Sequence, residues 1–296
     1  MKSEKGFFAR NNHLFYIGPH FVLFMIFGII PLFFGAYISL TTWDLTGTPD
    51  WVGLSNYKDI LFNTKSTFHI EFFTGMKNTL FFVACSVPLL IIFPLTIALA
   101  LHSKVKGNGI FQSVFYLPGL FSISAVGIIW GLVFNKRIGL MNVLFSRDVN
   151  WVSTQPYAWF VIIIVTVWWT IGGNMIIYRS ALNGIDIGMY EAAAIDGSNG
   201  VSTFFKITLP SIKFQILYTT VMTTLASFNI YGQPVMLTDG GPNGSTTVVM
   251  MVIRELAFGQ GKSIAGIGSA MAMLLGSLMI FISIFQFVLM SKDNTK

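Results

Sequence analysis

Six long apolar segments constrain this chain more than any other feature of its sequence. Each holds about 20 or more mostly apolar residues, the length that an α-helix needs to cross the hydrocarbon core of a bilayer. The predicted spans are Leu14–Leu40, Thr79–Leu101, Gln112–Phe134, Tyr157–Leu182, Phe214–Leu237 and Ile264–Met290. Because long apolar helices satisfy their own backbone groups in lipid, we expect an all-α, polytopic membrane protein with six transmembrane helices.

The amino-acid composition agrees with a chain that lies mostly in lipid. Of its 296 residues, 54% are hydrophobic and 10% are charged, whereas soluble domains carry about 25% charged residues. The net charge of +6 is therefore assigned to loops near anionic headgroups rather than to nucleic-acid binding. The single cysteine, Cys85, lies inside an apolar segment and is interpreted as a packing residue.

The charges of the loops predict the orientation of the chain. Six spans place both termini on one side of the membrane. Lysine and arginine are denser in the segments that lie inside when both termini are cytoplasmic, and the tight loop His102–Gly109 is the clearest of these. Because positively charged loops stay on the cytoplasmic side, we expect both termini to be cytoplasmic.

Several functional groups are absent from the predicted spans. None of the spans contains Asp, Glu or Lys, whereas ion-coupled carriers use intramembrane carboxylates. The stretch Phe258–Ser263 ends like a phosphate-binding loop, but Leu256 stands where that loop requires its first glycine. We expect no catalytic residue, metal site or cofactor site in this chain, and we expect any uphill transport to draw its energy from another subunit.

The stretch Asn183–Ile212, between the fourth and fifth spans, is polar and rich in small residues. Asp186 is predicted to cap a helix over Ile187–Ile195, and Gly197 is predicted to end it. Small side chains would let another surface approach this helix closely, and Glu191 offers a carboxylate to an arginine. Two interpretations are open here: a rigid contact surface for another protein, and an ordinary loop helix that lies on the membrane.

The remainder of this stretch is predicted to form a second short helix. The dipeptide Asn199-Gly200 separates the two helices, and the second is expected to begin at Ser202 or Thr203 and to run through Ile207. Pro210 is predicted to start the fifth span, because a missing N–H costs nothing in the first turn of a helix.

A spaced motif runs through the same stretch. It reads EAA, three residues, G, nine residues, I, one residue, L and P, and its residues are Glu191, Ala192, Ala193, Gly197, Ile207, Leu209 and Pro210. This pattern resembles the signature of the permease subunits of binding-protein-dependent ABC importers. Other stretches are similar to the sugar-importing branch, of the maltose and glycerol-3-phosphate permease type: Ser39–Ile60, Phe115–Gly119, Ile129–Asn142 and Leu237–Thr247.

The resemblance implies a fold, a mechanism and a set of partners. The fold is that of a MetI-like type I ABC importer permease, in which residues 187–197 form a coupling helix that docks on an ATPase. The residues implied in that contact are Tyr190, Glu191, Ala192, Ala193, Asp196, Gly197, Ile207, Leu209 and Pro210. The partners are a second permease that completes a heterodimer, two copies of the cytoplasmic ABC ATPase, which bind ATP and Mg, and an extracellular or periplasmic sugar-binding protein.

The expected organisation follows from the spans and from the resemblance. Its parts are a cytoplasmic tail (1–13), a first transmembrane helix with an outer loop (14–74), the ABC transmembrane core of five helices (75–290), which includes the coupling loop (183–212), and a second cytoplasmic tail (291–296). The chain looks like the first of two related permease subunits in a bacterial plasma (inner) membrane. It lacks the large outer domain of the maltose permease subunit.

A candidate substrate pathway lies on the fourth and fifth spans. A sugar site needs aromatic faces and hydrogen-bonding groups rather than charge, and one face of each span offers both at helical spacing. The resemblance matches these positions to those that line the sugar site in maltose-type permeases. They are Thr166, Trp169, Thr170, Gly173, Asn174, Thr223, Ala226, Ser227 and Ile230. Packing of the spans through small and hydroxyl residues would explain the same pattern without a substrate.

The function expected from these features is sugar import, driven by ATP hydrolysis in a separate subunit. The glycine-rich outer loop Thr238–Thr247 is interpreted either as a contact surface for the sugar-binding protein or as a simple tight turn. Two alternatives to the whole interpretation stay open: an ABC permease for a non-sugar solute, and an ion-coupled secondary carrier. A phosphate-bearing solute would call for lysine or arginine in the pathway, and none lies in the middle of a span.

Overall fold

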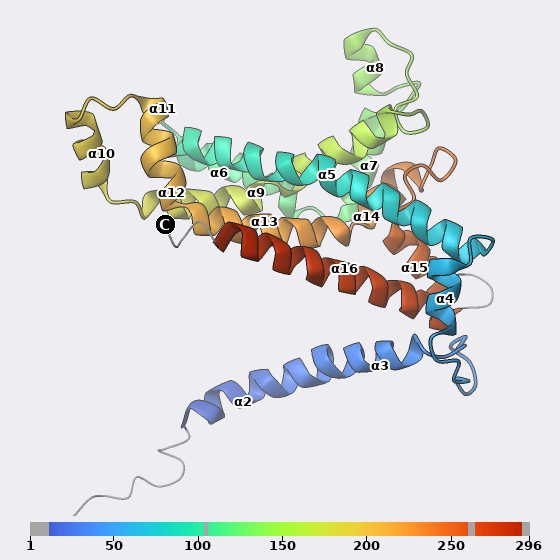
Figure 1. Ribbon diagram of the computed structural model, residues 1–296. Coiled ribbons are helices and arrows are strands. Elements are labelled where there is room, and N and C mark those ends of the chain that lie inside the picture. Colours follow the sequence, from blue (N-terminus) through green and yellow to red (C-terminus); the bar gives the residue numbers. More distant parts are fainter. Residues whose placement is uncertain (1–11, 104–105, 260–263, 292–296) are drawn as a thin grey trace, which may run out of the picture. The chain divides into compact units, whose positions relative to one another are not determined.

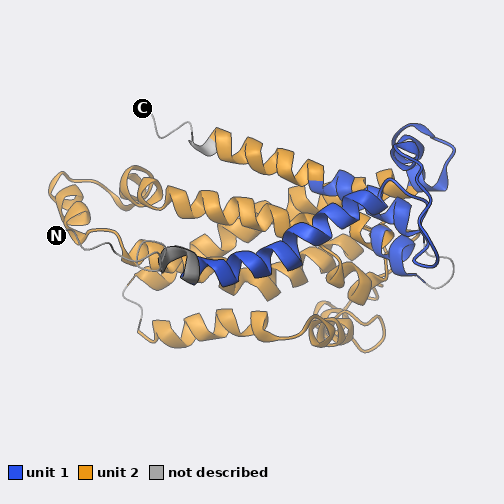
Figure 2. Cartoon of the chain, turned by 90° about the horizontal axis from the view of Figure 1, so that it is seen from below, with its two compact units in different colours: residues 1–70, 253–276 blue, residues 71–252, 277–296 orange. Residues whose placement is uncertain are grey.

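The computed structural model describes residues 12–103, 106–259 and 264–291, which form helices and turns (Figure 1). Among these residues the single pairing of extended segments is the isolated bridge between Thr41 and Trp51. The chain divides into two compact units (Figure 2), one made of residues 1–70 and 253–276 and the other of residues 71–252 and 277–296.

The first unit begins with a long helix that is interrupted by one π-helical turn. Its parts are α2 (Asn12–Phe24), η1 (Met25–Ile29) and α3 (Ile30–Ile38). In η1 the N–H of Ile30 donates to the carbonyl of Met25, directly before Pro31. Proline lacks an N–H and its ring collides with the carbonyl four residues earlier, so the wider π-turn carries the helix past the ring.

The rest of the first unit includes a loop that is held by one asparagine. Asn56 donates from Nδ2 to the carbonyls of Ser39 (2.9 Å) and Thr41 (2.8 Å). The N–H of Gly266 donates to the carbonyl of Trp43 at 3.1 Å. These bonds connect segments that are far apart in the sequence and give this loop a defined backbone.

The second unit holds most of the helices. The remaining elements of the chain, in order, are α4 (Ser55–Phe62), α5 (Thr67–His102), α6 (Asn108–Tyr116), η2 (Leu117–Leu120), α7 (Ile123–Val133), α8 (Leu140–Phe145), α9 (Tyr157–Asn183), α10 (Ile187–Ile195), α11 (Gly200–Thr203), η3 (Phe204–Thr208), α12 (Leu209–Ser211), α13 (Lys213–Phe228), α14 (Gly232–Thr238), α15 (Val249–Phe258) and α16 (Ala265–Ser291). Of these, α4 belongs to the first unit, and α5, α15 and α16 contribute residues to both.

Helix α9 is the centre of the second unit. It contacts α6, η2, α13 and α14, and its side chains Val161, Ile162, Met175 and Tyr178 are fully buried. The hydroxyl groups of Tyr178 and Thr219 share a hydrogen bond of 2.5 Å, which ties α9 to α13. In a bilayer, helices associate through close packing and interhelical hydrogen bonds rather than through exclusion of water, so these contacts are the ones that hold the unit together.

A glycine lets α6 approach α9 closely. A Cβ atom at Gly172 would lie 2.7 Å from the Cα of Tyr116 and 2.8 Å from the carbonyl oxygen of Phe115, and both of these are backbone atoms that a rotamer change cannot move. The neighbouring Gly173 has no atom within 4 Å of such a Cβ. The contact between the two helices therefore depends on the missing side chain of Gly172.

The helices agree with the predicted all-α class but divide two of the predicted spans. Gln112–Phe134 is a bent pair of helices, Asn108–Leu120 and Ile123–Val133, at 102° to each other. Phe214–Leu237 is divided into α13 and α14. The described helices that are long and apolar enough to cross a membrane are Tyr16–Ile38, Thr67–His102, Tyr157–Asn183 and Ala265–Leu289, with the bent pair as a fifth candidate. The count of six spans stays a prediction.

We predict that Gly172→Ala lowers the stability of the protein by about 1–3 kcal/mol, because the added methyl group overpacks a backbone contact. Gly173→Ala, one residue away, is the matched control and is expected to leave stability unchanged, since its methyl group meets open space. Thermal unfolding of the two detergent-solubilised variants measures the difference. Equal midpoints would show that α6 does not pack on α9 as described.

Candidate functional site

The polar segment between α9 and α13 begins with a capped helix. The carboxylate of Asp186 accepts the N–H of Gly188 at 2.9 Å, at the start of α10. At the other end, Gly197 has a left-handed φ of +73°, and the N–H of Ser198 donates to the carbonyl of Ala193 at 2.9 Å. This pair of features forms a glycine C-cap. The predicted helix Ile187–Ile195 and both of its ends are confirmed.

The second half of this segment differs from the prediction. Helix α11 begins at Gly200 rather than at Ser202 or Thr203, because Asn199 caps it by accepting the N–H of Ser202 at 2.8 Å. The π-turn η3 follows, and in it the N–H of Leu209 donates to the carbonyl of Phe204, directly before Pro210.

The prediction that Pro210 starts the fifth span was also wrong. Pro210 lies in the first turn of the short helix α12, and α13 begins at Lys213. A π-turn thus precedes both Pro31 and Pro210, because each ring excludes the ordinary hydrogen bond to the carbonyl four residues earlier.

The residues of the spaced motif divide into a buried and an exposed group. Ala193 is buried, and the hydroxyl groups of Tyr190 and Thr208 share a hydrogen bond of 3.1 Å, which ties α10 back to η3. The side chains of Glu191, Ala192 and Asp196 are exposed, as are Gly197 and Pro210, whereas Ile207 and Leu209 are half-buried. The bond between Tyr190 and Thr208 therefore supports α10 on one side, while the carboxylates of Glu191 and Asp196 are exposed. Figure 1 shows α10 and α11 at one end of the helices of the second unit.

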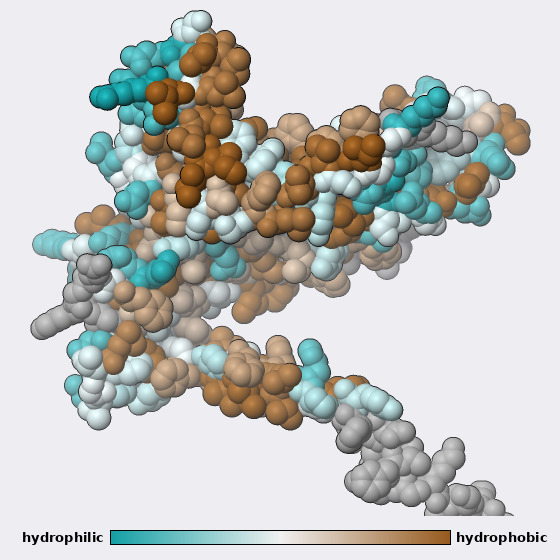
Figure 3. Space-filling model, turned by 180° about the vertical axis from the view of Figure 1, so that it is seen from behind, coloured by the Kyte–Doolittle hydropathy of each residue, from teal (hydrophilic) through white to brown (hydrophobic). Residues whose placement is uncertain are grey.

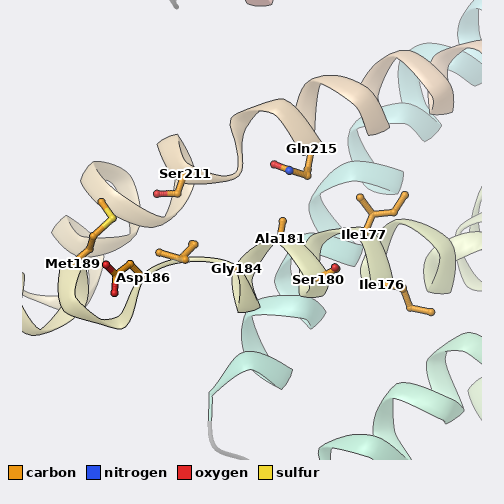
Figure 4. A pocket seen from close by; sticks show the side chains of 10 residues that line it. Ile176, Ile177, Ser180, Ala181, Gly184, Asp186, Met189, Ser211 and Gln215 are labelled. Carbon is orange, nitrogen blue, oxygen red and sulfur yellow. The ribbon is translucent and has the colours of Figure 1, made fainter. Parts of the chain in front are cut away.

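A groove of about 890 Å³ lies where α9, α10 and α13 meet (Figure 4). Its lining residues are Ile176, Ile177, Ser180, Ala181, Gly184, Ile185, Asp186, Met189, Ser211 and Gln215. This groove was not predicted, because its residues come from four helices (α9, α10, α12 and α13) and the connection 184–186, and share no motif. The groove separates α10 from α9 and α13 on this side. Only residues 184–186 join α9 to α10.

A cavity of about 690 Å³ lies between α9 and α13. All nine residues predicted for the substrate pathway line it: Thr166, Trp169, Thr170, Gly173, Asn174, Thr223, Ala226, Ser227 and Ile230. Five come from α9, three come from α13, and Ile230 lies in the break between α13 and α14. The structure thus brings the two predicted faces together around one space.

Two side chains of α9 fix the wall of this cavity. The indole Nε1 of Trp169 donates to the carbonyl of Phe121 at 3.1 Å. Asn174 donates from Nδ2 to the carbonyl of Leu90 and to the Oγ1 of Thr223, both at 2.9 Å. The carbonyl of Leu90 lacks its usual helical partner, because residue 94 of α5 is a proline. Asn174 therefore satisfies that carbonyl and links three helices.

Eight lining residues of the cavity were not predicted from the sequence. They are Phe82, Leu90, Ile123, Met222, Asn229, Tyr231, Gly232 and Gln233. Half of them lie at the break between α13 and α14 or in the first turn of α14, namely Asn229, Tyr231, Gly232 and Gln233, and Ile123 starts α7 after the sharp bend. Gly232 was a signal for the break, since glycine interrupts helices. None of the described residues that line the cavity carries a charge.

The glycine-rich loop Thr238–Thr247 is held from two sides. Asn78, on α5, donates from Nδ2 to the carbonyls of Gly244 (3.1 Å) and Thr247 (2.9 Å). Gln155, before α9, donates from Nε2 to the Oγ of Ser245 at 2.7 Å. These bonds give the loop a defined conformation. That conformation is compatible with a contact surface for another protein and also with a simple tight turn.

Helices broken beside an uncharged cavity, together with an exposed polar segment between α9 and α13 in a chain with several long apolar helices, are features of a membrane transport subunit. Residues 73–292 match the family described as the inner membrane component of binding-protein-dependent transport systems. The chain belongs to this family, whose members are transport subunits rather than enzymes. It is 30% identical over 280 residues to the probable ABC transporter permease protein YesP of Bacillus subtilis, and the match covers 92% of this chain and 88% of that protein.

A second relative and a solved structure agree with this assignment. The chain is 32% identical over 263 residues to the trehalose/maltose transport system permease protein MalF of Thermococcus litoralis, with 86% of this chain and 85% of that protein covered. A chain of a bacterial alginate ABC transporter, solved in complex with an alginate pentasaccharide-bound periplasmic protein, superposes with a TM-score of 0.79. It is 21% identical and covers 98% of this chain and 97% of its own length. This likeness confirms the type I ABC permease fold.

We predict that Asn174→Ala destabilises the protein by about 1–3 kcal/mol, because the carbonyl of Leu90 is then buried without a partner. Thr223→Ala is the matched control: it removes the other acceptor of Asn174 and leaves the bond to Leu90 in place, so we expect a smaller loss. Thermal unfolding in detergent compares them. If Thr223→Ala costs as much as Asn174→Ala, the carbonyl of Leu90 is not what Asn174 stabilises.

Proposed function

We propose that this chain is one of the two permease subunits of an ATP-driven carbohydrate importer. It pairs with a second permease to form the pathway for a sugar that an extracellular or periplasmic binding protein delivers. Two copies of a cytoplasmic ATPase bind ATP and Mg and drive the cycle. Both termini are cytoplasmic, and the tails 1–13 and 291–296 flank the first helix with its loop (14–74) and the core (75–290).

The sugar assignment rests on the chemistry of the cavity of about 690 Å³ between α9 and α13, which we call the central cavity. Its lining combines the indole of Trp169 with hydroxyl and amide groups such as Ser227 and Gln233, and none of its described lining residues is charged. Neutral hydroxylated solutes are recognised by aromatic faces and hydrogen bonds, whereas a phosphate would call for lysine or arginine. The relative from Thermococcus litoralis, described as a trehalose/maltose permease, supports the same class of substrate.

The assignment of α10 as the coupling helix rests on how it joins the cavity. Only residues 184–186 separate α9 from α10, and only Ile212 separates α12 from α13. The two helices that line the cavity are thus the two that hold the ends of the polar segment. A push on the exposed carboxylates of Glu191 and Asp196 would pass directly to both helices, without a long flexible linker to absorb it.

Co-purification tests the whole proposal. The tagged chain is solubilised from its own membrane in detergent, the proteins that accompany it are identified, and ATPase activity is measured with the binding protein and a panel of sugars. We expect an ATPase, a second permease and a binding protein, and we expect one sugar to stimulate hydrolysis. Solute transport by the isolated chain in liposomes without ATP would overturn the proposal in favour of a secondary carrier.

We predict that Glu191→Lys lowers sugar uptake by at least about tenfold while the chain stays in the membrane, because it sets a cation against an arginine that we expect on the ATPase. Glu191→Gln is the matched control, which keeps the size and the hydrogen-bond acceptor, and it should lose less. Uptake and co-purification of the ATPase are measured together. Normal uptake by Glu191→Lys would exclude Glu191 from the coupling contact.

We predict that Ser227→Leu changes the preferred sugar or raises the half-saturating sugar concentration, because the larger side chain fills the central cavity. Tyr218→Leu is the control, since Tyr218 is an exposed residue of α13 that does not line the cavity. Sugar-stimulated ATPase activity of the assembled complex is the measurement, and ATPase docking should be intact in both variants. An unchanged sugar profile would mean that the substrate contacts lie in the partner permease.

A further inference from the structure

The loop that joins α7 to α9 turns its apolar side chains outward. Five large side chains in and beside α8 are 53–71% exposed. They are Ile138, Leu140, Val143, Leu144 and Phe145, and we call them the α8 apolar surface. Contiguous apolar surface of this kind marks a site that contacts another protein or a membrane.

The loop holds this arrangement through its one buried asparagine, Asn142. Its Nδ2 donates to the carbonyls of Lys136 and Val149, both at 2.9 Å. Its Oδ1 accepts the indole N–H of Trp151 at 2.8 Å and the N–H of Val149 at 3.3 Å. The centre of the loop is therefore occupied by this hydrogen-bonded amide and by the packed side chains of Phe134 and Trp151, and the five apolar side chains face outward.

The α8 apolar surface continues onto a helix that we assign to the membrane. On α7, the side chains of Ile128 and Leu132 are also more than half exposed. Figure 3 shows the hydrophobic colour passing from α8 down onto α7. Figure 1 shows α8 extending to one side of α5, α6 and α9 rather than beyond their ends. A segment that extends sideways near the end of membrane-crossing helices runs along the membrane surface.

The charges around this surface are mainly positive. Lys136, Arg137 and Arg147 flank it, and Asp148 is the one acidic residue in residues 134–156. The ammonium of Lys136 lies 3.9 Å from the carboxylate of Asp148, but both side chains are exposed, so this pair is weak. An apolar surface bordered by basic residues is typical of segments that lie in the interface of a bilayer with anionic lipids.

We propose that the α8 apolar surface inserts into the headgroup region of the bilayer, with anionic lipid headgroups around Lys136, Arg137 and Arg147. The occupant is the lipid surface rather than a protein, because the apolar side chains continue those of a membrane helix and the charge at their border matches anionic lipid. The loop then anchors the bent pair α6–α7, which lines one end of the central cavity through Ile123.

A fluorescent label tests the insertion in the assembled complex. The chain has one cysteine, Cys85, so Cys85→Ser gives a background in which Leu144→Cys and, separately, Asp148→Cys carry one environment-sensitive fluorophore each. Both positions are exposed, so the label leaves the bonds of Asn142 in place. The complex is placed in nanodiscs that contain nitroxide-labelled lipids, with and without phosphatidylglycerol. Val143→Cys repeats the measurement in case the first label disturbs the loop.

The expected result is nitroxide quenching at Leu144→Cys that exceeds the quenching at Asp148→Cys about threefold or more. Phosphatidylglycerol should increase it, and Arg137→Gln with Arg147→Gln should remove that increase. Absence of lipid quenching at both Leu144→Cys and Val143→Cys would overturn the proposal. If the label is shielded only when the binding protein is added, the surface is a docking site for that protein. If the label is shielded at all times without lipid quenching, the surface contacts the partner permease. Both results would also overturn the proposal.

Discussion

Every backbone N–H and C=O that lies in lipid needs a partner inside the protein, and the interior of this permease is organised by that requirement. Its cavity lies where helices break, and each break frees backbone groups. The indole of Trp169 satisfies the carbonyl of Phe121 at the bend before α7. The amide of Asn174 satisfies the carbonyl of Leu90 that Pro94 leaves free. Trp169 and Asn174, two of the polar residues at the cavity, therefore have a structural role.

Helix α9 connects the two parts of the proposed function. Its middle part carries Trp169 and the other four lining residues of α9, and its end leads through residues 184–186 into α10. The buried bond between Tyr178 and Thr219 ties it to α13, the other wall of the cavity. In the proposed function, a movement of α10 would therefore act on both walls of the cavity together.

Sequence patterns predicted the features that depend on local chemistry. The helix Ile187–Ile195 was predicted to the residue, because an aspartate cap and a left-handed glycine determine its ends locally. The nine residues predicted for the pathway line one cavity, and eight of them lie on α9 and α13, where helical spacing determines which side chains lie on one face. The breaks at residues 121–122 and 229–231 were missed, because hydropathy averages over a window and a bend of 102° leaves it unchanged. The outward apolar face of α8 depends on the tertiary bonds of Asn142, which no local pattern reveals.

The π-turn before Pro210 allows the number of residues in the polar segment to change without a change in its direction. A π-turn is one residue longer than the ordinary turn that it replaces, and it spreads one full rotation over more residues than the 3.6 of an α-helix. Loss of a single residue from Phe204–Thr208 would therefore convert the π-turn into an ordinary turn and leave α11, and α10 before it, pointing in nearly the same direction. If α10 is the coupling helix that we propose, this turn keeps its direction constant through the gain or loss of one residue.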